Sequence, residues 1–461
     1  MSQIFCILLP MSGNWFAIFV FSITIGTVWL FSVYDWGYGV LRGMLLLVLG
    51  LFLLSMQFFR RLTFSSDGML RWAVWAFLAV VVLFNLFYGI RTLEVVRSTR
   101  YLGFDQAQMS YHAAKFLISK VNPYGQNSIV DPLVYNLAIA RYQNRTECIK
   151  YSPQKMIASF SAFWDRPGGS AEGMEMFFPV IAADKKCEDI RRAFGSLGYP
   201  YGPVTIATYM PLVLAFEESG LFVAHLLLMG ILAVLLFWIG WNLTRRGNAI
   251  LACLPPLLVL LTPIFRHNFL GLAASDLPAV LFATVFVALW LKGRYELAAL
   301  ALALSLGSKI APGLLFLPLI IRSPLRMGLT MVIVLAVFYM PFLLWDAEGL
   351  KNTFLVTMVN RSTDSTSLIH FISPSAALIL KMTVLSALAV LVIWVTRRGW
   401  TGIRAFRYLA FAHIGFLFVA PSIHNNYLTW LLPVLGLALI CEIYSNKRSQ
   451  NSKKFKEEDA D

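Results

Sequence analysis

The sequence predicts an all-α polytopic membrane protein with about twelve transmembrane helices, a large extracytoplasmic loop and juxtamembrane helices. Of its 461 residues, 58% are hydrophobic and only 13% are charged, whereas soluble domains average about 25% charged residues. Apolar runs such as 14–34 and 73–90 are long enough to cross about 30 Å of hydrocarbon as helices. Their continuous apolar character, without alternation of period 2, argues against a β-barrel.

The expected spans divide the chain into four parts. Residues 1–90 carry three spans, 91–218 form the loop with its amphipathic juxtamembrane helices, 219–445 carry about nine spans, and 446–461 are a charged tail. The spans are expected at 14–33, 38–57, 70–89, 219–241, 247–264, 274–291, 296–308, 310–322, 327–345, 373–396, 404–421 and 426–444. The two short spans on either side of Lys309 are expected to form a hairpin that turns before the far surface.

Short loops rich in Lys and Arg predict the orientation. They contain Arg60-Arg61, Arg71, Arg245-Arg246, Lys292, Arg294, Arg322, Arg326, Arg397-Arg398 and Lys447-Arg448. Because cytoplasmic loops carry such an excess, this side is expected to be the cytoplasm of an inner (plasma) membrane, and the long loop then faces the periplasm or exterior. The net charge of +14 is therefore interpreted as a topology signal and a contact with anionic membrane lipids, and no nucleic-acid partner is expected.

One apolar segment, 201–220, is too short to be an unambiguous span. We interpret it as an interfacial helix on the outer surface, with Glu217 and Glu218 at its wet end. The alternative, a true span, would put Arg245-Arg246 on the outer side, against the pattern of the other loops.

The long loop carries aromatic residues, among them Trp164, and two cysteines. This composition is typical of a small folded cap. Cys148 and Cys187 are the two cysteines that face an oxidising compartment, so they form either a disulfide or two free thiols.

A lone acid opens the first amphipathic segment of the loop. Asp105, Met109 and His112 share one face at helical spacing, so the carboxylate and the imidazole are expected to face a cleft together. Asp105 is well placed to act as a base, and its alternative role is a solvated helix N-cap. Tyr111 either stacks on a sugar or lies at the membrane interface.

Further polar residues gather on the same outward rim. They are Arg266, His267, Asn268, Asp276, Lys309, Asn360, Arg361, His370, His424, Asn425 and Tyr427. Lys309 lies in a Ser-Lys-Ile-Ala-Pro turn between two short apolar runs, where a buried ammonium needs an anion, although a lysine near the surface also snorkels. His424 and Asn425 suit sugar-hydroxyl hydrogen bonds or loop solvation equally well.

The sequence offers no cofactor motif. No Cys, His or carboxylate spacing indicates a metal site, and no Gly-rich phosphate loop occurs. Neither a metal nor another cofactor is therefore expected, and a soluble nucleotide-sugar donor is disfavoured.

Several segments together resemble a known family. Asp105, then Tyr111 and Asn122-Pro123-Tyr124, resemble the first outward loop of polytopic glycosyltransferases of the C superfamily, in the branch related to polyprenyl-phosphate-mannose-dependent mannosyltransferases. The Tyr-Gly-Pro at 201–203, the stretch 274–321 with its Lys before a Pro, and the segment 422–439 follow in the order of that family. The chain departs from the family in having three spans before the loop and Ala-Ser-Asp at 274–276, and the latter leaves the role of Asp276 open.

The resemblance implies transfer of a sugar from a polyprenyl-phosphate donor to a hydroxyl of an extracytoplasmic glycan or glycolipid, with inversion. Asp105 would be the general base. Because the phosphate leaving group carries negative charge, cations are needed beside it. Donor-phosphate candidates are Lys309, Arg266 and His267, and the weaker ones are Arg91, Arg97 and Arg100. Substrate-binding candidates are Tyr111, His112, Asp276, His370, His424, Asn425 and Tyr427.

Two other functions stay open. Twelve spans with both ends inside are a common layout of transporters and lipid flippases, but the single long loop and the gathering of polar groups at one rim favour an enzyme. A polymerase or ligase of lipid-linked glycans would share the outward site and differ mainly in its substrate.

Overall fold

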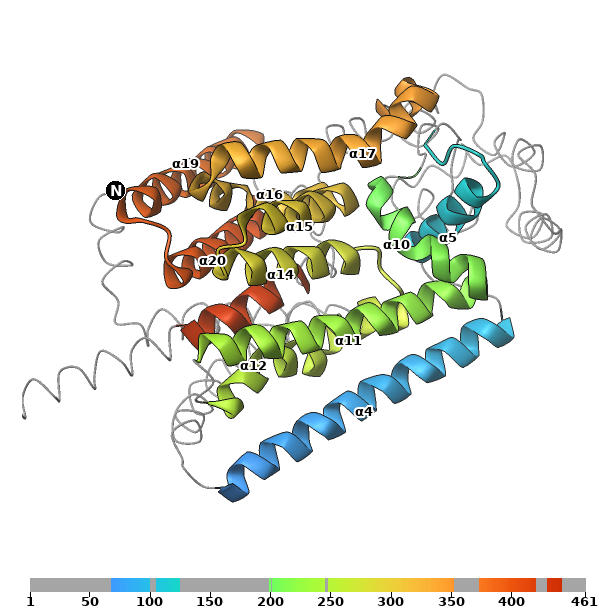
Figure 1. The fold of residues 1–461 in the computed structure, drawn as a ribbon, viewed down its shortest axis with the longest axis horizontal. Helices are drawn as coiled ribbons and strands as arrows, with labels where there is room; N and C mark the ends of the chain where they lie inside the picture. Colours follow the sequence, from blue (N-terminus) through green and yellow to red (C-terminus); the bar gives the residue numbers. More distant parts are fainter. Residues whose placement is uncertain are drawn as a thin grey trace, which may run out of the picture.

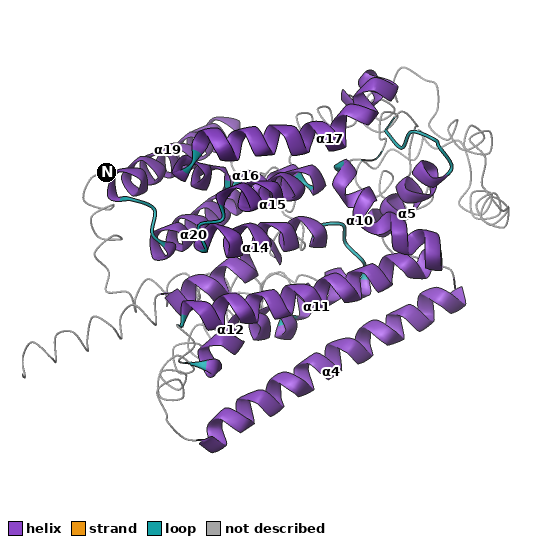
Figure 2. Cartoon of the chain, in the orientation of Figure 1, coloured by secondary structure: helices purple, strands orange, loops and turns teal. Residues whose placement is uncertain are grey.

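The computed structural model describes residues 68–99, 105–124, 199, 201–244, 248–351, 373–419 and 429–441. All regular elements in these ranges are helices (Figure 2). They are α4 (Gly68–Thr99), α5 (Asp105–Ile118), α10 (Pro203–Phe216), α11 (Glu218–Leu243), α12 (Ala249–Leu261), α13 (Pro263–Arg266), the π-helix η5 (His267–Gly271), α14 (Leu277–Leu291), α15 (Tyr295–Ser308), α16 (Ile310–Leu314), the 3-10 helix η6 (Leu317–Arg322), α17 (Pro324–Lys351), α19 (Pro374–Arg398), α20 (Gly402–Val419) and the helix Thr429–Cys441.

Within the described ranges, four helices are long and apolar enough to cross a membrane. They are Leu78–Ser98 within α4, Glu218–Leu243, Pro324–Lys351 and Pro374–Arg398. The predicted class, an all-α membrane protein, is confirmed to this extent. The count of about twelve spans stays a prediction, and the expected spans at 14–33 and 38–57 lie outside the described residues.

The outer helices bury little of their surface. Large apolar side chains of α17, such as Leu329 and Val337, and of α19, such as Ile379, are mostly exposed. A helix that is apolar yet exposed needs an apolar solvent, because hydrocarbon surface in water is unfavourable. Hydrocarbon chains of a bilayer meet that need.

The helices lie side by side, with α4 along one edge of the bundle and α17 with α19 along the opposite edge (Figure 1). Helices α14 and α15 pack together between these edges, and α5 and α10 cover one end. Helices α4 and α15 end there, and helices α11 and α14 begin there (Figure 1). The end of α14, which precedes Lys292, lies at the other end of the bundle. The orientation of the bundle in a membrane stays a prediction.

Several inner helices stop short of the bilayer's thickness. At 1.5 Å per residue, α14 and α15 measure about 20 Å, against about 30 Å of hydrocarbon. The backbone of Lys309 is extended, with φ −151° and ψ 124°, and it separates α15 from α16. The expected span 310–322 is therefore two short pieces, α16 and η6, with Pro312 in the first and Pro318 at the start of the second.

The segment 201–220 contains a helix that does not run on into the next one. Glu217 has φ 53°, a left-handed conformation that ends α10 before α11 begins at Glu218. The chain folds back so closely here that a Cβ on Gly220 would overlap the carbonyl oxygen of Leu212. Whether α10 lies in the membrane interface stays a prediction.

Candidate functional site

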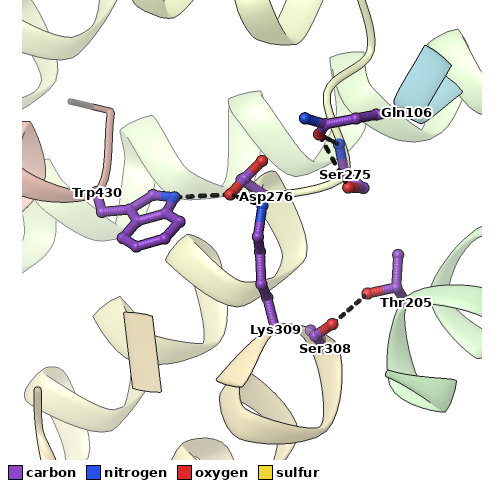
Figure 3. A network of polar contacts seen from close by, with 7 residues as sticks. All are labelled: Gln106, Thr205, Ser275, Asp276, Ser308, Lys309 and Trp430. Atoms are coloured by element: carbon purple, nitrogen blue, oxygen red, sulfur yellow. Dashed lines mark hydrogen bonds and ion pairs between the residues drawn. The ribbon is translucent and has the colours of Figure 1, made fainter. Parts of the chain in front are cut away.

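A buried ion pair lies where α14 begins and α15 ends (Figure 3). Lys309 Nζ lies 2.6 Å from Asp276 Oδ1, and Trp430 Nε1 donates to the same oxygen at 2.8 Å. The Asp276 side chain is fully buried, and that of Lys309 is 14% exposed. The carboxylate thus receives two donors, one charged and one neutral, from segments far apart in the sequence.

Each charge of this pair lies at the end of a helix whose dipole suits it. Asp276 directly precedes α14, at the positive end of that helix dipole. Lys309 directly follows α15, at its negative end. The helix ends and the opposite charge together offset the cost of burying each group, which for an isolated ion is several kcal/mol.

Aromatic rings complete the surroundings of the ammonium. Lys309 Nζ lies 5.1 Å from the ring centroid of Tyr201 and 5.5 Å from that of Trp430. Both distances are within the range of cation–π attraction. The lysine is therefore held by one carboxylate and two rings, which is a defined position and unlike the free end of a snorkelling side chain.

Helix α10 fixes the backbone just before Lys309. The carbonyl oxygen of Ser308 accepts hydrogen bonds from the Gly202 amide at 2.9 Å and from Thr205 Oγ1 at 3.0 Å. A Cβ on Gly202 would overlap the carbonyl oxygen of Gly307, so only glycine allows this approach. The first turn of α10 thereby satisfies a carbonyl that the end of α15 leaves unpaired.

Helix α5 is joined to the same site. Gln106 Oε1 accepts from the amide of Ser275 at 3.2 Å and from its hydroxyl at 3.1 Å. Gln106 follows Asp105, the first residue of α5, and Ser275 precedes Asp276. The backbone at Asp105 is therefore one residue from a direct contact with the segment that carries the ion pair, and its side chain lies outside the described structure.

The other face of α5 is attached to the turn between α10 and α11. Glu217 Oε2 accepts from Lys115 Nζ at 2.5 Å and from the hydroxyl of Tyr111 at 3.2 Å. Burial, together with Glu218 and Glu217, raises the pKa of Tyr111, so the phenol stays a donor. Tyr111, an expected sugar contact, thus already donates a hydrogen bond to Glu217.

His112 lies beside Tyr111 with a ring-centroid separation of 5.1 Å. Burial, and secondarily the charge of Lys115, lowers the pKa of His112 to about 3. The imidazole is therefore neutral at physiological pH. A neutral ring can accept or donate one hydrogen bond but adds no positive charge for a phosphate.

Arg266 does not join the ion pair. Its guanidinium carbon lies 4.7 Å from the ring centroid of Phe84 and 5.3 Å from that of Tyr88, both on α4. The side chain of its neighbour His267, in η5, is not described. Of the three expected phosphate contacts, only Lys309 is seen in the site with Asp276.

The remaining sequence candidates fall outside the described residues. They are His370, His424, Asn425 and Tyr427, and the disulfide candidates Cys148 and Cys187. Trp430 lies three residues after Tyr427 and begins the final helix with Thr429. Trp430, which was not among the predicted substrate contacts, is the residue of this region that contacts the ion pair in the described ranges.

Several site residues were not predicted. They are Gln106, Tyr201, Thr205, Ser275, Ser308 and Trp430. Gln106 and Ser275 are each adjacent to a residue that was predicted, which is a weak signal. A second buried polar pair, Tyr209 and His225 at 2.9 Å, was also missed, and both residues are fully buried.

A small, mostly apolar cavity of about 10 Å³ lies beside Trp430. It is lined by residues of α14, α16, α20 and the helix Thr429–Cys441, together with Phe316. The indole of Trp430 therefore borders both the ion pair and this cavity.

Among the described residues, no three His, Cys, Asp or Glu side chains gather closely enough to hold a metal ion. Comparison of the chain with protein-family models, with curated proteins and with solved structures finds no match.

Proposed function

We propose that the protein is an integral membrane glycosyltransferase that transfers a sugar from a polyprenyl-phosphate donor to a hydroxyl of an extracytoplasmic glycan or glycolipid, with inversion. The observation that carries the proposal is the Gln106–Ser275 contact, which joins the start of α5 to the segment of Asp276 and Lys309. The backbone of Asp105 and the side chain of Lys309 lie at the same end of the bundle, which supports a role for a carboxylate and a cation together. These are the two charges that glycosyl transfer from a phosphate requires.

The proposed reaction uses each charge once. Asp105 accepts the proton of the acceptor hydroxyl as its oxygen attacks the anomeric carbon of the donor. The bond from that carbon to the phosphate oxygen breaks, and the polyprenyl phosphate leaves with the bonding electrons. Lys309 stabilises the charge on the departing oxygens, and Asp276 keeps the ammonium in place when the site is empty.

The apolar surroundings of Lys309 support a lipid-linked donor. The indole of Trp430 is within cation–π distance of Lys309 and also borders a small cavity lined by Val280, Val434 and Leu437. A lipid phosphate at the lysine would have apolar side chains beside it, from which a soluble sugar nucleotide would gain little.

Transfer from a labelled polyprenyl-phosphate sugar in proteoliposomes tests the proposal. Asp105→Asn is expected to lose at least about a hundredfold in turnover, because a general base is worth about 10²–10⁴ in rate. Glu348→Gln, which neutralises an exposed acid of α17, is the matched control and is expected to keep wild-type turnover. Near-normal turnover by the Asp105 variant would remove that residue from the mechanism.

A transporter is the second candidate, and one observation favours it. Two buried polar pairs, Asp276–Lys309 and Tyr209–His225, lie within the bundle, the first of them at the break between α15 and α16. Ionisable groups in such places commonly mark ion or proton pathways. Proton movement into proteoliposomes, measured without substrate by a pH-sensitive dye in the lumen, distinguishes a transporter from a glycosyltransferase. Lys309-dependent proton movement without any sugar transfer would favour the transporter.

A further inference from the structure

Arg266 is a cation whose charge is not balanced by any acid in the described part of the chain. Its contacts there are the rings of Phe84 and Tyr88, at 4.7 and 5.3 Å from the guanidinium carbon. The ion pairs found in those ranges involve other basic residues. Rings attract a cation but do not use its N–H donors, which stay available to an anion.

The surface around Arg266 is apolar and open. Leu83, Phe84 and Phe87 of α4 are 62%, 51% and 58% exposed. All three belong to the stretch Leu78–Ser98, which is long and apolar enough to cross a membrane. A ligand that reaches the guanidinium from this side therefore meets hydrocarbon-compatible surface first, and it needs an apolar part as well as a negative charge.

The depth of the guanidinium suits a lipid headgroup. Phe84 and Tyr88 precede Arg91 by three to seven residues, which is about 5–10 Å along a helix. Arg91 itself lies 5.5 Å from the ring of Phe87 and pairs with Glu94 at 3.0 Å, with both charged side chains largely exposed. Arg266 is therefore just below the level at which α4 becomes polar, where the phosphates of lipids lie.

We propose that Arg266, with Phe84 and Tyr88, binds the phosphate of an anionic phospholipid whose chains lie against α4. A guanidinium can hold two phosphate oxygens at once, and the two rings limit the positions it can adopt. The printed contacts of Arg266 are with rings of α4, and those of Lys309 are with Asp276, Tyr201 and Trp430, so the two cations share no contact in the described ranges. The proposal does not depend on glycosyl transfer.

Native mass spectrometry of the full-length protein, loaded with phosphatidylglycerol or phosphatidylcholine, tests this site. Arg266→Gln is expected to retain phosphatidylglycerol at least about tenfold less well than the wild type, the effect of one lost charge-assisted contact. The matched control is Lys351→Gln, an exposed basic residue at the end of α17, on the opposite edge of the bundle from α4, which is expected to behave as the wild type. Equal retention by Arg266→Gln and the wild type would overturn the proposal.

Two further variants guard against a folding artefact. Arg266→Lys keeps the charge without the planar fork and is expected to retain an intermediate amount of lipid. The double variant Phe84→Leu and Tyr88→Leu keeps the arginine without its rings and is expected to lose retention by a few-fold. If both variants match the wild type, the rings and the guanidinium do not form a site.

The identity of the lipid is tested with polyprenyl phosphate as a separate probe. Arg266-dependent retention of phosphatidylglycerol supports the phospholipid site. Arg266-dependent retention of polyprenyl phosphate, with none of phosphatidylglycerol, would overturn it and assign the arginine to the donor. Sugar transfer is measured on the same samples, so that failure of the proposed function and failure of this lipid site are seen independently.

Discussion

Two lysine–carboxylate pairs in this protein have nearly the same length and very different surroundings. Lys309 and Asp276 lie 2.6 Å apart, with side chains 14% and 0% exposed, whereas Lys115 and Glu217 lie 2.5 Å apart, with side chains 38% and 57% exposed. A buried charge that loses its partner is costly, but an exposed one is simply rehydrated. The distance between the two atoms therefore says little about what each pair contributes, and burial decides it.

The largest effect is expected from Asp276→Asn. The amide keeps the shape and can still accept from Trp430, but it leaves the ammonium of Lys309 without an opposite charge. Removing one partner of a buried pair costs about 3–5 kcal/mol of stability. Thermal unfolding in detergent, compared with that of the wild type, measures the loss.

The double variant Asp276→Asn with Lys309→Met is the control for charge. With both charges gone, much of the lost stability is expected to return. A double variant no more stable than the single one would show that the carboxylate acts through packing and not through its charge.

Gly202→Ala is expected to lower the stability by an intermediate amount. It tests whether the buried pair depends on the backbone that surrounds it, because Gly202 contacts the segment just before Lys309 and neither charge of the pair. The new methyl group would overlap the carbonyl oxygen of Gly307, next to the Ser308 carbonyl that positions Lys309. Overpacking of this kind costs about 1–3 kcal/mol. Gly328→Ala in α17 is the matched control, since a Cβ there meets nothing within 4 Å, and it is expected to be neutral or slightly stabilising. Equal unfolding temperatures for the two variants would contradict the close approach.

The smallest effect is expected from Lys115→Met. The exposed pair with Glu217 is worth about 0.2–1 kcal/mol, and salt screens it. Unfolding curves of this variant and the wild type are therefore expected to differ slightly at about 0.1 M salt and to coincide at about 1 M, where the Debye length is only about 3 Å. A loss as large as that of Asp276→Asn would remove the distinction between the two pairs.

The long helices were the most predictable part of the fold. The expected spans 219–241 and 373–396 correspond to Glu218–Leu243 and Pro374–Arg398, because continuous apolar composition is a local property of the sequence. The expected span 310–322 instead divides into α16 and η6. Pro312 and Pro318 lie within these pieces. Because proline lacks the backbone N–H that a continuous helix needs, the helices here are shorter than the apolar run.

The members of the site were partly predictable, but their pairing was not. Lys309 and Asp276 each stand out as a charge at the edge of an apolar run, which a single sequence shows. That they bind each other across 33 residues follows from how α14 packs on α15. Trp430, 154 residues from Asp276, has no local mark that distinguishes it from the many tryptophans expected at a membrane interface.

The hydrogen bond from Trp430 to Asp276 joins segments that are synthesised at different times. The ribosome adds about 5–20 residues per second, so roughly 8–30 s separate the synthesis of Asp276 from that of its tryptophan partner. Lys309 arrives much earlier, and the two opposite charges can neutralise each other while the rest of the chain is still being made. The two opposite charges can therefore pair before the helix that carries Trp430 is made, and the indole then joins a pair that already exists.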